Sequence, residues 1–299
     1  MKELALTRSI NERLASKEFL VSVQIDPPKP DQFDDFRKTI NVLADIGVDL
    51  VDVNSSRRLC HDSLLLAAYL KNLGLEVIPH ITTRDSTING LLSQMAAANQ
   101  LQKIKNFLVI TGDAYPVGST LANSPGVFEC DSVGLIGIAA EKLKLTAGLD
   151  LTLIAAVNQN NPDLEAEKLR LKQKIVAGAG MFMSQPVFNE DQLDELLDFY
   201  SYHTSLPLLV GVWPLVDSKT LRAIEDGKVS GVVIPQSVSA ESKKLCKDAE
   251  VLRSWGLAKA LQLVQAAKDR MADGVYIVAP SRQPLQILDF LKAVLAMRS

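Results

Sequence analysis

LVSVQIDPPKP, residues 20–30, is an apolar run typical of a buried strand, and it ends in a proline-rich turn. In an open doubly wound sheet, the first strand is usually followed by a glycine-rich turn that opens a helix. Here the turn contains Asp26 and three prolines and no glycine. The stretch therefore favours a closed α/β barrel over an open sheet.

The rest of the chain alternates short β-rich runs with amphipathic helical stretches, a pattern typical of parallel βαβ units. The expected strands are Leu20–Ile25, Leu50–Val53, Leu75–Ile81, Asn106–Thr111, Leu151–Ala156, Met181–Ser184, Leu208–Val212 and Gly274–Val278. The expected helices are Phe33–Ala44, Asp62–Leu73, Ile88–Leu101, Asp131–Leu143, Pro162–Ala177, Glu190–Tyr200, Ala240–Ala272 and Gln283–Met297. Eight β/α units are the number in a closed barrel, so the sequence predicts a single (β/α)8 TIM barrel.

Residues 216–239 fit this pattern least well. Val232–Pro235 would suit a ninth strand, but a loop or helical insertion before the last unit is the favoured interpretation. No internal repeat or low-complexity linker is present, so we expect residues 1–299 to form one domain with an insertion-like segment around 216–239.

Composition excludes several classes of protein. With 47% hydrophobic and 22% charged residues, the chain is typical of globular proteins, and its net charge of −3 without a basic cluster argues against nucleic-acid binding. Cys60, Cys130 and Cys246 lie far apart, so neither a zinc site nor a disulfide framework is indicated. No signal peptide and no apolar run of ~20 residues appears. We expect a soluble, cytoplasmic protein without a metal.

Active sites of TIM barrels lie at the C-terminal ends of the strands, which defines the candidate residues. They are Gln24, Asp26, Asn54, His80, Thr82, Gly112, Asp113, Asn158, Gln185 and Arg282. His80 is either a hydrogen-bonded structural residue or a catalytic base, and Asp113 either caps a turn or projects into the barrel mouth. Gln185 offers both a donor and an acceptor, which suits a pterin-like ring. The residues alone thus predict a barrel enzyme with a polar, acid-containing mouth.

Six motifs at these strand ends resemble the methylenetetrahydrofolate reductase family. They are VSVQIDPPK (21–29), PHITTRD (79–85), LVITGD (108–113), AAVNQNNP (155–162), KIVAGAGMFMSQPVF (174–188) and LVGVWPL (209–215). The resemblance is closest to the branch in which this domain is fused behind a homocysteine methyltransferase. Because the methyltransferase half is absent from this sequence, we expect a stand-alone reductase-type unit.

The resemblance implies that 5,10-methylenetetrahydrofolate is reduced to 5-methyltetrahydrofolate through bound FAD, with NAD(P)H or a protein electron donor as reductant. The residues that resemble the flavin site are Asn54, Ser55, His80, Thr82, Gly112, Asp113, Asn158, Glu167, Arg170 and Lys174. Arg170 and Lys174 share a helix face at i, i+4, where they either meet the flavin phosphates or form a solvated basic face. Those that resemble folate contacts are Gln24, Asp113, Gln185 and Arg282, of which the last suits an anionic glutamate tail.

One motif departs from the family. Gln24 stands where the family typically has a glutamate that protonates the folate, and an amide cannot supply that proton. Asp26 lies two residues on and faces the same side of the strand, so it is a candidate replacement. However, the related branch carries an aspartate at the position of Asp26 in addition to the glutamate, so Asp26 is not an obvious evolved substitute. General acid catalysis is typically worth ~10²–10⁴ in rate, so the change bears on activity. We therefore treat Gln24, Asp26 and Asp113 as the candidate catalytic residues.

Two other functions remain open. The chain could be a folate- and flavin-binding accessory or regulatory protein whose redox activity is impaired by Gln24, or a pterin-dependent methyltransferase barrel. The resemblance to proteins that work in complexes is compatible with a partner subunit, an electron-donor protein or a homo-oligomer.

Overall fold

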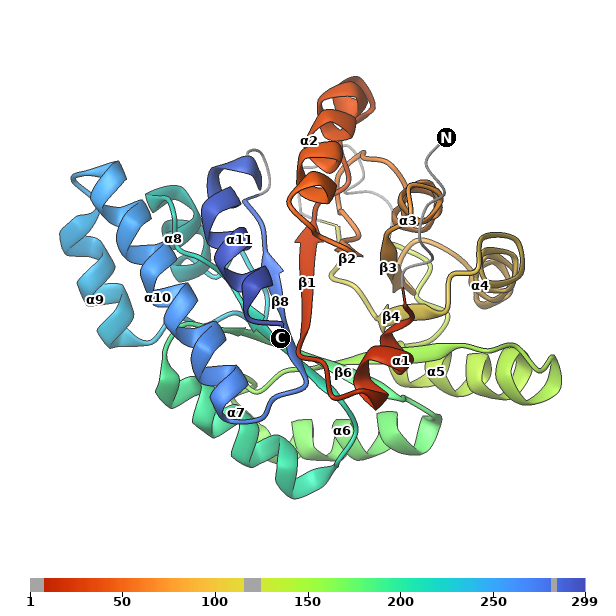
Figure 1. Cartoon of the computed structure of the whole chain (residues 1–299). Coiled ribbons are helices and arrows are strands. Elements are labelled where there is room, and N and C mark those ends of the chain that lie inside the picture. The colour runs from red at the N-terminus through yellow and green to blue at the C-terminus, as the bar shows by residue number, and fades with distance from the viewer. Residues whose placement is uncertain (1–7, 116–124, 281–283, 299) are drawn as a thin grey trace.

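The computed structural model describes residues 8–115, 125–280 and 284–298. Eight parallel strands form a closed barrel in chain order, surrounded by helices (Figure 1). The strands are β1 (Leu20–Ile25), β2 (Leu50–Val53), β3 (Glu76–Thr82), β4 (Asn106–Ile110), β5 (Thr152–Val157), β6 (Met181–Val187), β7 (Leu208–Val212) and β8 (Gly274–Val278). The predicted (β/α)8 TIM barrel is confirmed.

Helices lie between the strands, and most of them fall within the ranges that the sequence predicted. They are α1 (Ile10–Ala15), α2 (Phe33–Asp45), α3 (Ser63–Asn72), α4 (Ile88–Gln102), α5 (Ser132–Ala139), α6 (Leu164–Ala177), α7 (Glu190–His203), α8 (Ser218–Glu225), α9 (Gln236–Leu245), α10 (Ala249–Asp269) and α11 (Leu288–Ala296), with a π-helix at Ala140–Thr146 and 3-10 turns at Pro30–Gln32 and Pro284–Ile287. Several begin at a residue whose side chain accepts a hydrogen bond from the first turn. These residues are Asp62, Thr87, Asp131, Asp163, Asn189, Asp217 and Asp248. Such caps satisfy N–H groups that have no partner within the helix.

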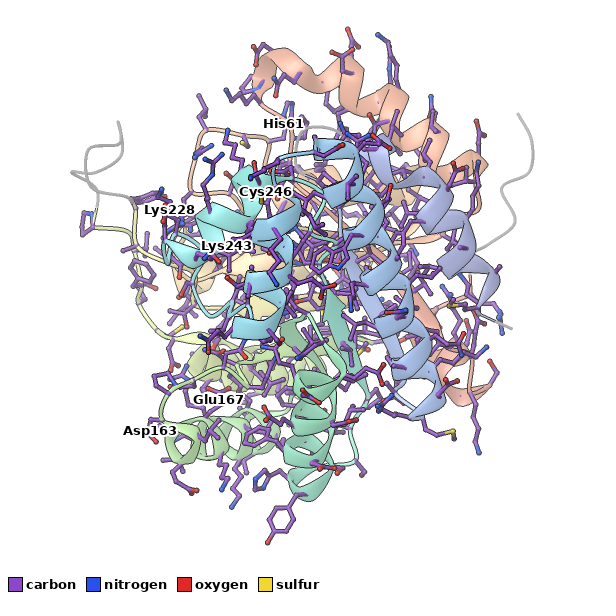
Figure 2. All side chains as sticks on the ribbon, turned by 90° about the vertical axis from the view of Figure 1, so that its left-hand side faces the viewer. His61, Asp163, Glu167, Lys228, Lys243 and Cys246 are labelled. Atoms are coloured by element: carbon purple, nitrogen blue, oxygen red, sulfur yellow. The ribbon has the colours of Figure 1, made fainter. Side chains whose placement is uncertain are left out.

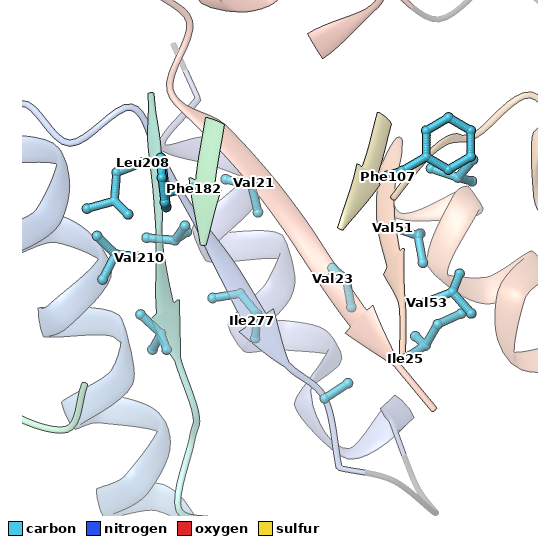
Figure 3. Packing of buried hydrophobic residues seen from close by; sticks show 14 of the residues in the cluster. Val21, Val23, Ile25, Val51, Val53, Phe107, Phe182, Leu208, Val210 and Ile277 are labelled. Carbon is cyan, nitrogen blue, oxygen red and sulfur yellow. The ribbon is translucent and has the colours of Figure 1, made fainter. Parts of the chain in front are cut away.

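Side chains alternate along each strand between the helical layer and the barrel interior. On β1, Val21, Val23 and Ile25 pack with the large outer core, which Figure 3 shows beside Val51 and Val53 of β2. A second apolar cluster fills the interior of the barrel. It contains Ile10, Leu20, Leu50, Ile78, Leu108, Ile154, Met181, Met183, Leu209, Tyr276 and Val278. The interior is therefore a packed core, and polar inward residues concentrate toward the strand ends.

Helix α1 was not predicted from the sequence. It lies at the N-terminal end of β1 (Figure 1), and its buried Ile10 packs into the interior cluster. Ser9 and Glu12 form a capping box, and the spacing Ser-x-x-Glu is the sequence signal that would have located the helix. The helix closes the end of the barrel opposite the candidate site.

The prediction of one helix over Ala240–Ala272 is wrong. The chain forms α9 and α10 instead, because Asp248 accepts hydrogen bonds from the backbone N–H groups of Glu250 and Val251 and starts a new helix there. Val232–Pro235 forms no strand, and residues 216–239 contain α8 and the start of α9, joined by a loop.

The insertion has its own apolar core, which consists of Phe188, Leu215, Leu221, Ile224, Val232 and Val238. Helix α10 approaches the start of the insertion closely at Gly256. A Cβ atom at this position would lie only 2.2 Å from the carbonyl oxygen of Leu215, so the close approach requires glycine. In the described part of the chain, no helix is long and apolar enough to cross a membrane.

Candidate functional site

A buried polar cluster lies inside the barrel beneath the mouth. Asp52 of β2 is 0% exposed, accepts a hydrogen bond from Ser22 Oγ at 2.7 Å, and lies 3.3 Å from His80 Nε2 through its other oxygen. The backbone N–H of His80 donates to Ser63 Oγ at 3.1 Å, and that hydroxyl donates to the carbonyl of Val53. His80 is thus held by β2 and by the start of α3, and its side chain is 6% exposed.

Gln24 lies at the C-terminal end of β1, and Asp26 is the first residue after the strand. Gln24 is the register partner of Asp52 on β2 and of Val278 on β8. Asp26 Oδ1 accepts a hydrogen bond from Asn54 Nδ2 at 2.9 Å, which joins the loops that follow β1 and β2. The amide of Gln24 has no hydrogen-bond partner among the described residues, so it is available to a ligand.

Arg84 ties together the loops that follow β2, β3 and β4. Its side chain is 2% exposed and donates to both carboxylate oxygens of Asp85, at 2.7 and 2.6 Å. It also donates to the carbonyl oxygens of Ser56 and Asp113 and lies 3.4 Å from Ser55 Oγ. A buried bidentate arginine of this kind fixes loop geometry more strongly than a surface ion pair does.

We call Arg84, Asp85 and the loop groups that they contact the Arg84 clamp. Within it, Arg84 and Asp85 each stabilise the charged form of the other. Burial of Asp85 acts to raise its pKa, but hydrogen bonds from Arg84, Tyr115 and Thr82 outweigh that effect and lower the pKa. Burial likewise acts to lower the pKa of Arg84, and the hydrogen bonds and charge of Asp85 raise it instead. Thr82, predicted as a flavin-site residue, donates to Asp85 at 2.8 Å and so belongs to this clamp.

Gly112 and Asp113 follow β4. Gly112 has a φ of +81°, and a Cβ atom there would lie 3.3 Å from Thr82 Cβ, so any other residue at this position is strained and must displace its neighbour slightly. The Asp113 side chain is 47% exposed and lies 3.6 Å from the guanidinium of Arg57. The carboxylate is thus about half exposed, and among the described helices none has Asp113 as its N-terminal cap.

The polar residues after β5 are occupied by internal contacts. The backbone N–H of Asn158 donates to Glu167 Oε1 at 2.9 Å, and Lys174 Nζ donates to the carbonyl of Ala156 at 2.6 Å. The pKa of Lys174 is lowered mainly by burial, which outweighs the opposing charge of Glu167. Arg170 bridges to Asp131 at 3.3 Å. Glu167 and Lys174 thus anchor α6 to the end of β5, and neither side chain points to solvent.

Gln185 at the end of β6 is positioned by its neighbour Gln159. Gln159 Nε2 donates to the carbonyl of Gln185 at 2.7 Å, and its Oε1 accepts from the backbone N–H of Gln185 at 3.0 Å. The insertion covers the Gln185 amide, because a Cβ atom on Gly231 would lie 3.2 Å from Gln185 Cδ. The Asn160 side chain donates to the carbonyl of Gly231, which fixes the insertion over β5 and β6.

The predicted residues thus fall into three groups. The first group follows β1 to β4 and is joined by the Arg84 clamp and the Asp52 cluster. The second consists of Gln185 and Asn158, which lie under the insertion. The third consists of Glu167, Arg170 and Lys174, which lie on α6. Figure 2 shows Glu167 on α6, Lys228 in the insertion, and Lys243 and Cys246 on α9 and at its C-terminal end. Arg282 lies outside the described residues.

Sequence reasoning missed Asp52, Arg84, Asp85 and Tyr115. The signal for Asp52 was a single charge within the apolar run LVDV, and Arg84 and Asp85 lay within the quoted motif PHITTRD. No group of three or more metal-ligating side chains is present among the described residues. Two surface hollows, between α7 and α10 and between α5 and α6, lie away from the strand ends and contain none of the predicted residues.

The model of the methylenetetrahydrofolate reductase family matches residues 9–290. The chain belongs to this family. The match spans almost all of the barrel, including every strand end described above. No curated protein sequence matches the chain.

Solved structures share the fold of this family member. An uncharacterized protein from Clostridium thermocellum that binds two copies of 5-methyl-5,6,7,8-tetrahydrofolic acid has a TM-score of 0.69 and 14% identity, with 96% of this chain and 98% of that chain covered. Oxaloacetate acetylhydrolase has a TM-score of 0.55 and 12% identity, with 99% of this chain and 85% of that chain covered. 2,3-Dimethylmalate lyase has a TM-score of 0.52 and 13% identity, with 97% and 80% covered. At these identities the likeness shows the barrel fold alone.

Proposed function

We propose that this chain reduces 5,10-methylenetetrahydrofolate to 5-methyltetrahydrofolate with FAD as its cofactor. The observation that carries the proposal is the set of hydrogen-bonding groups without a partner among the described residues, at the mouth of a barrel of this family. The side-chain amides of Gln24 and Gln185 have no partner among the described residues, and both are only partly buried. An amide offers a donor and an acceptor, which complements the alternating edge of a pterin.

The chain's residues also fit a flavin. His80 is almost fully buried as a residue, and its Nδ1 atom has no hydrogen-bond partner in the described ranges, which leaves one acceptor or donor for a ligand. Asn54, Ser55 and the tight turn at Gly112 surround the same strand ends. FAD would supply hydride transfer to the folate, and the barrel would supply position and electrostatics.

The chain's own contribution to the reaction falls on three residues. Gln24 and Gln185 would orient the pterin, and Asp113 would stabilise the positive charge of the iminium form of the substrate through its carboxylate. Because Asp113 is about half exposed, its field is partly screened until the bound ligands exclude water. The proton for the folate nitrogen would come from Asp26 through a bridging water.

Purification and reconstitution with FAD test the proposal. A yellow protein whose flavin is bleached by a reductant and reoxidised by methylenetetrahydrofolate is the expected result. A protein that binds flavin and folate without reoxidation would instead establish the accessory or regulatory function that Gln24 favours. A protein that binds neither ligand would contradict both.

The wider setting of the reaction is part of the same proposal. We propose a cytoplasmic single-domain enzyme with NAD(P)H or a protein donor as reductant. We also propose that the chain works with a partner subunit or as a homo-oligomer.

A further inference from the structure

The Asp52 cluster has a feature that the proposed reaction does not use. Asp52 is a completely buried carboxyl group whose two oxygens each have one polar contact: Ser22 Oγ donates to Oδ2, and His80 Nε2 lies 3.3 Å from Oδ1. Ser22 is also 0% exposed, so the cluster is closed on the side of the barrel core. Its other end is the ring of His80, one strand nearer to the Arg84 clamp.

The acceptor chemistry of Asp52 restricts His80. An ionised carboxylate can only accept hydrogen bonds, so the proton between the two groups is carried by His80 Nε2. A neutral imidazole protonated at Nε2 presents a lone pair at Nδ1. Nδ1 has no partner in the described part of the chain, and the strand alternation places the ring inside the barrel.

We propose that Asp52 is a positioning residue that holds His80 with its proton on Nε2, so that Nδ1 accepts a hydrogen bond from a ligand N–H or O–H group at the barrel mouth. Ser22 supports this arrangement by fixing the second oxygen of Asp52. The inference rests on the proposed function only for the identity of that ligand, a flavin. The state of the His80 ring follows from the cluster alone.

Two substitutions separate the hydrogen bond from the charge. Asp52→Leu removes the acceptor while keeping a buried side chain of similar size, and an apolar replacement of a buried charge is often tolerated. Asp52→Asn keeps an oxygen acceptor but removes the charge. Glu76→Gln is the matched control, because Glu76 is a buried carboxyl at the other end of the barrel that contacts Asn106 and Lys71 and not His80.

The first measurement is nitrogen-15 NMR of the imidazole rings, without any cofactor. The chain has only three histidines, His61, His80 and His203, so the signals can be assigned by substitution. We expect the parent and Glu76→Gln to show a slowly exchanging Nε2–H signal for His80. The signal should vanish in Asp52→Leu and be retained, shifted, in Asp52→Asn. A proton on Nδ1 in the parent, or an unchanged signal in Asp52→Leu, would overturn the proposal.

The second measurement is the dissociation constant of FAD, by fluorescence quenching. Loss of one well-oriented hydrogen bond should weaken FAD binding roughly two- to tenfold in Asp52→Leu, with partial recovery in Asp52→Asn. Equal FAD affinity in parent and Asp52→Leu, after the NMR signal has been lost, would overturn the acceptor role of Nδ1. If the parent binds no FAD, the proposed function fails, while the NMR result still decides the positioning of His80. Circular dichroism would show whether each variant is folded.

Discussion

Gly231 offers a direct test of whether the insertion forms one wall of the folate site. Its φ of +75° is a left-handed conformation that costs an L-residue roughly 1–2 kcal/mol, so Gly231→Ala should lower the free energy of unfolding by about that amount. In addition, the new Cβ atom would lie 3.2 Å from Gln185 Cδ and Nε2, a few tenths of an ångström inside ordinary contact. The Gln185 amide must therefore move, and with it any hydrogen bond that it makes to the folate.

Gly227 is the matched control within the same insertion. Its φ is +68°, and a Cβ atom there meets nothing within 4 Å, so Gly227→Ala carries the backbone strain without the collision. Both variants should lower the melting temperature by roughly 2–4 °C for each kcal/mol of stability lost. Only Gly231→Ala should raise the folate Michaelis constant, by roughly two- to tenfold, the effect of one weakened hydrogen bond. Steady-state kinetics with reoxidation of the flavin measures it. Equal Michaelis constants in the two variants would refute the idea that the insertion positions Gln185.

Three further predictions concern carboxyl groups. Asp113→Asn should leave the melting temperature nearly unchanged, since an exposed ion pair is worth ~0–1 kcal/mol. The rate of flavin reoxidation by the folate should fall at least ~10-fold. Equal rates in variant and parent would remove Asp113 from the site. Gln24→Glu should accelerate reoxidation in stopped-flow experiments toward the ~10²–10⁴ expected of a general acid, and Asp26→Asn should abolish it; if neither changes the rate, the proton comes from another group. Burial raises the pKa of Glu76, so the stability that this residue contributes is present below its unfolded pKa of 4.5 and is lost as the pH rises through the folded value. Urea unfolding should therefore show Glu76→Gln gaining stability relative to the parent between pH 4 and 7, and a gain on acidification would contradict that sign.

The strands and most helices could be predicted because their periodicity is local. The break between α9 and α10 could not, since amphipathic spacing continues through Cys246 and only the cap at Asp248 interrupts it. Helix α1 has six residues, too few for a periodic signal, and its cap is the stronger evidence.

The site could be predicted as a set of strand ends but not as a set of contacts. Asp52 and His80 are 28 residues apart in sequence, and the hydrogen bond between them depends on the register of β2 and β3. Gly231 and Gln185 meet only because the insertion folds back across β6, and nothing in the sequence of residues 216–239 indicates that return. Lys174 illustrates the opposite case, since its charge suggested a ligand contact and its position on α6 directs it to a backbone carbonyl.

The contacts of Asp26 limit how it could replace a glutamate at position 24. Asn54 occupies Oδ1, so a proton on this carboxyl group would be carried by Oδ2, which has no partner among the described residues. Asp26 lies two residues beyond Gln24, a distance of roughly 6–7 Å along an extended chain, and its side chain is one methylene shorter than that of glutamate. A folate nitrogen in contact with Gln24 therefore lies beyond direct reach of Asp26, and a bridging water must carry the proton. Such a step is slower than direct transfer from a positioned acid, so any folate reduction by the parent should be limited by protonation of the folate and not by reduction of the flavin.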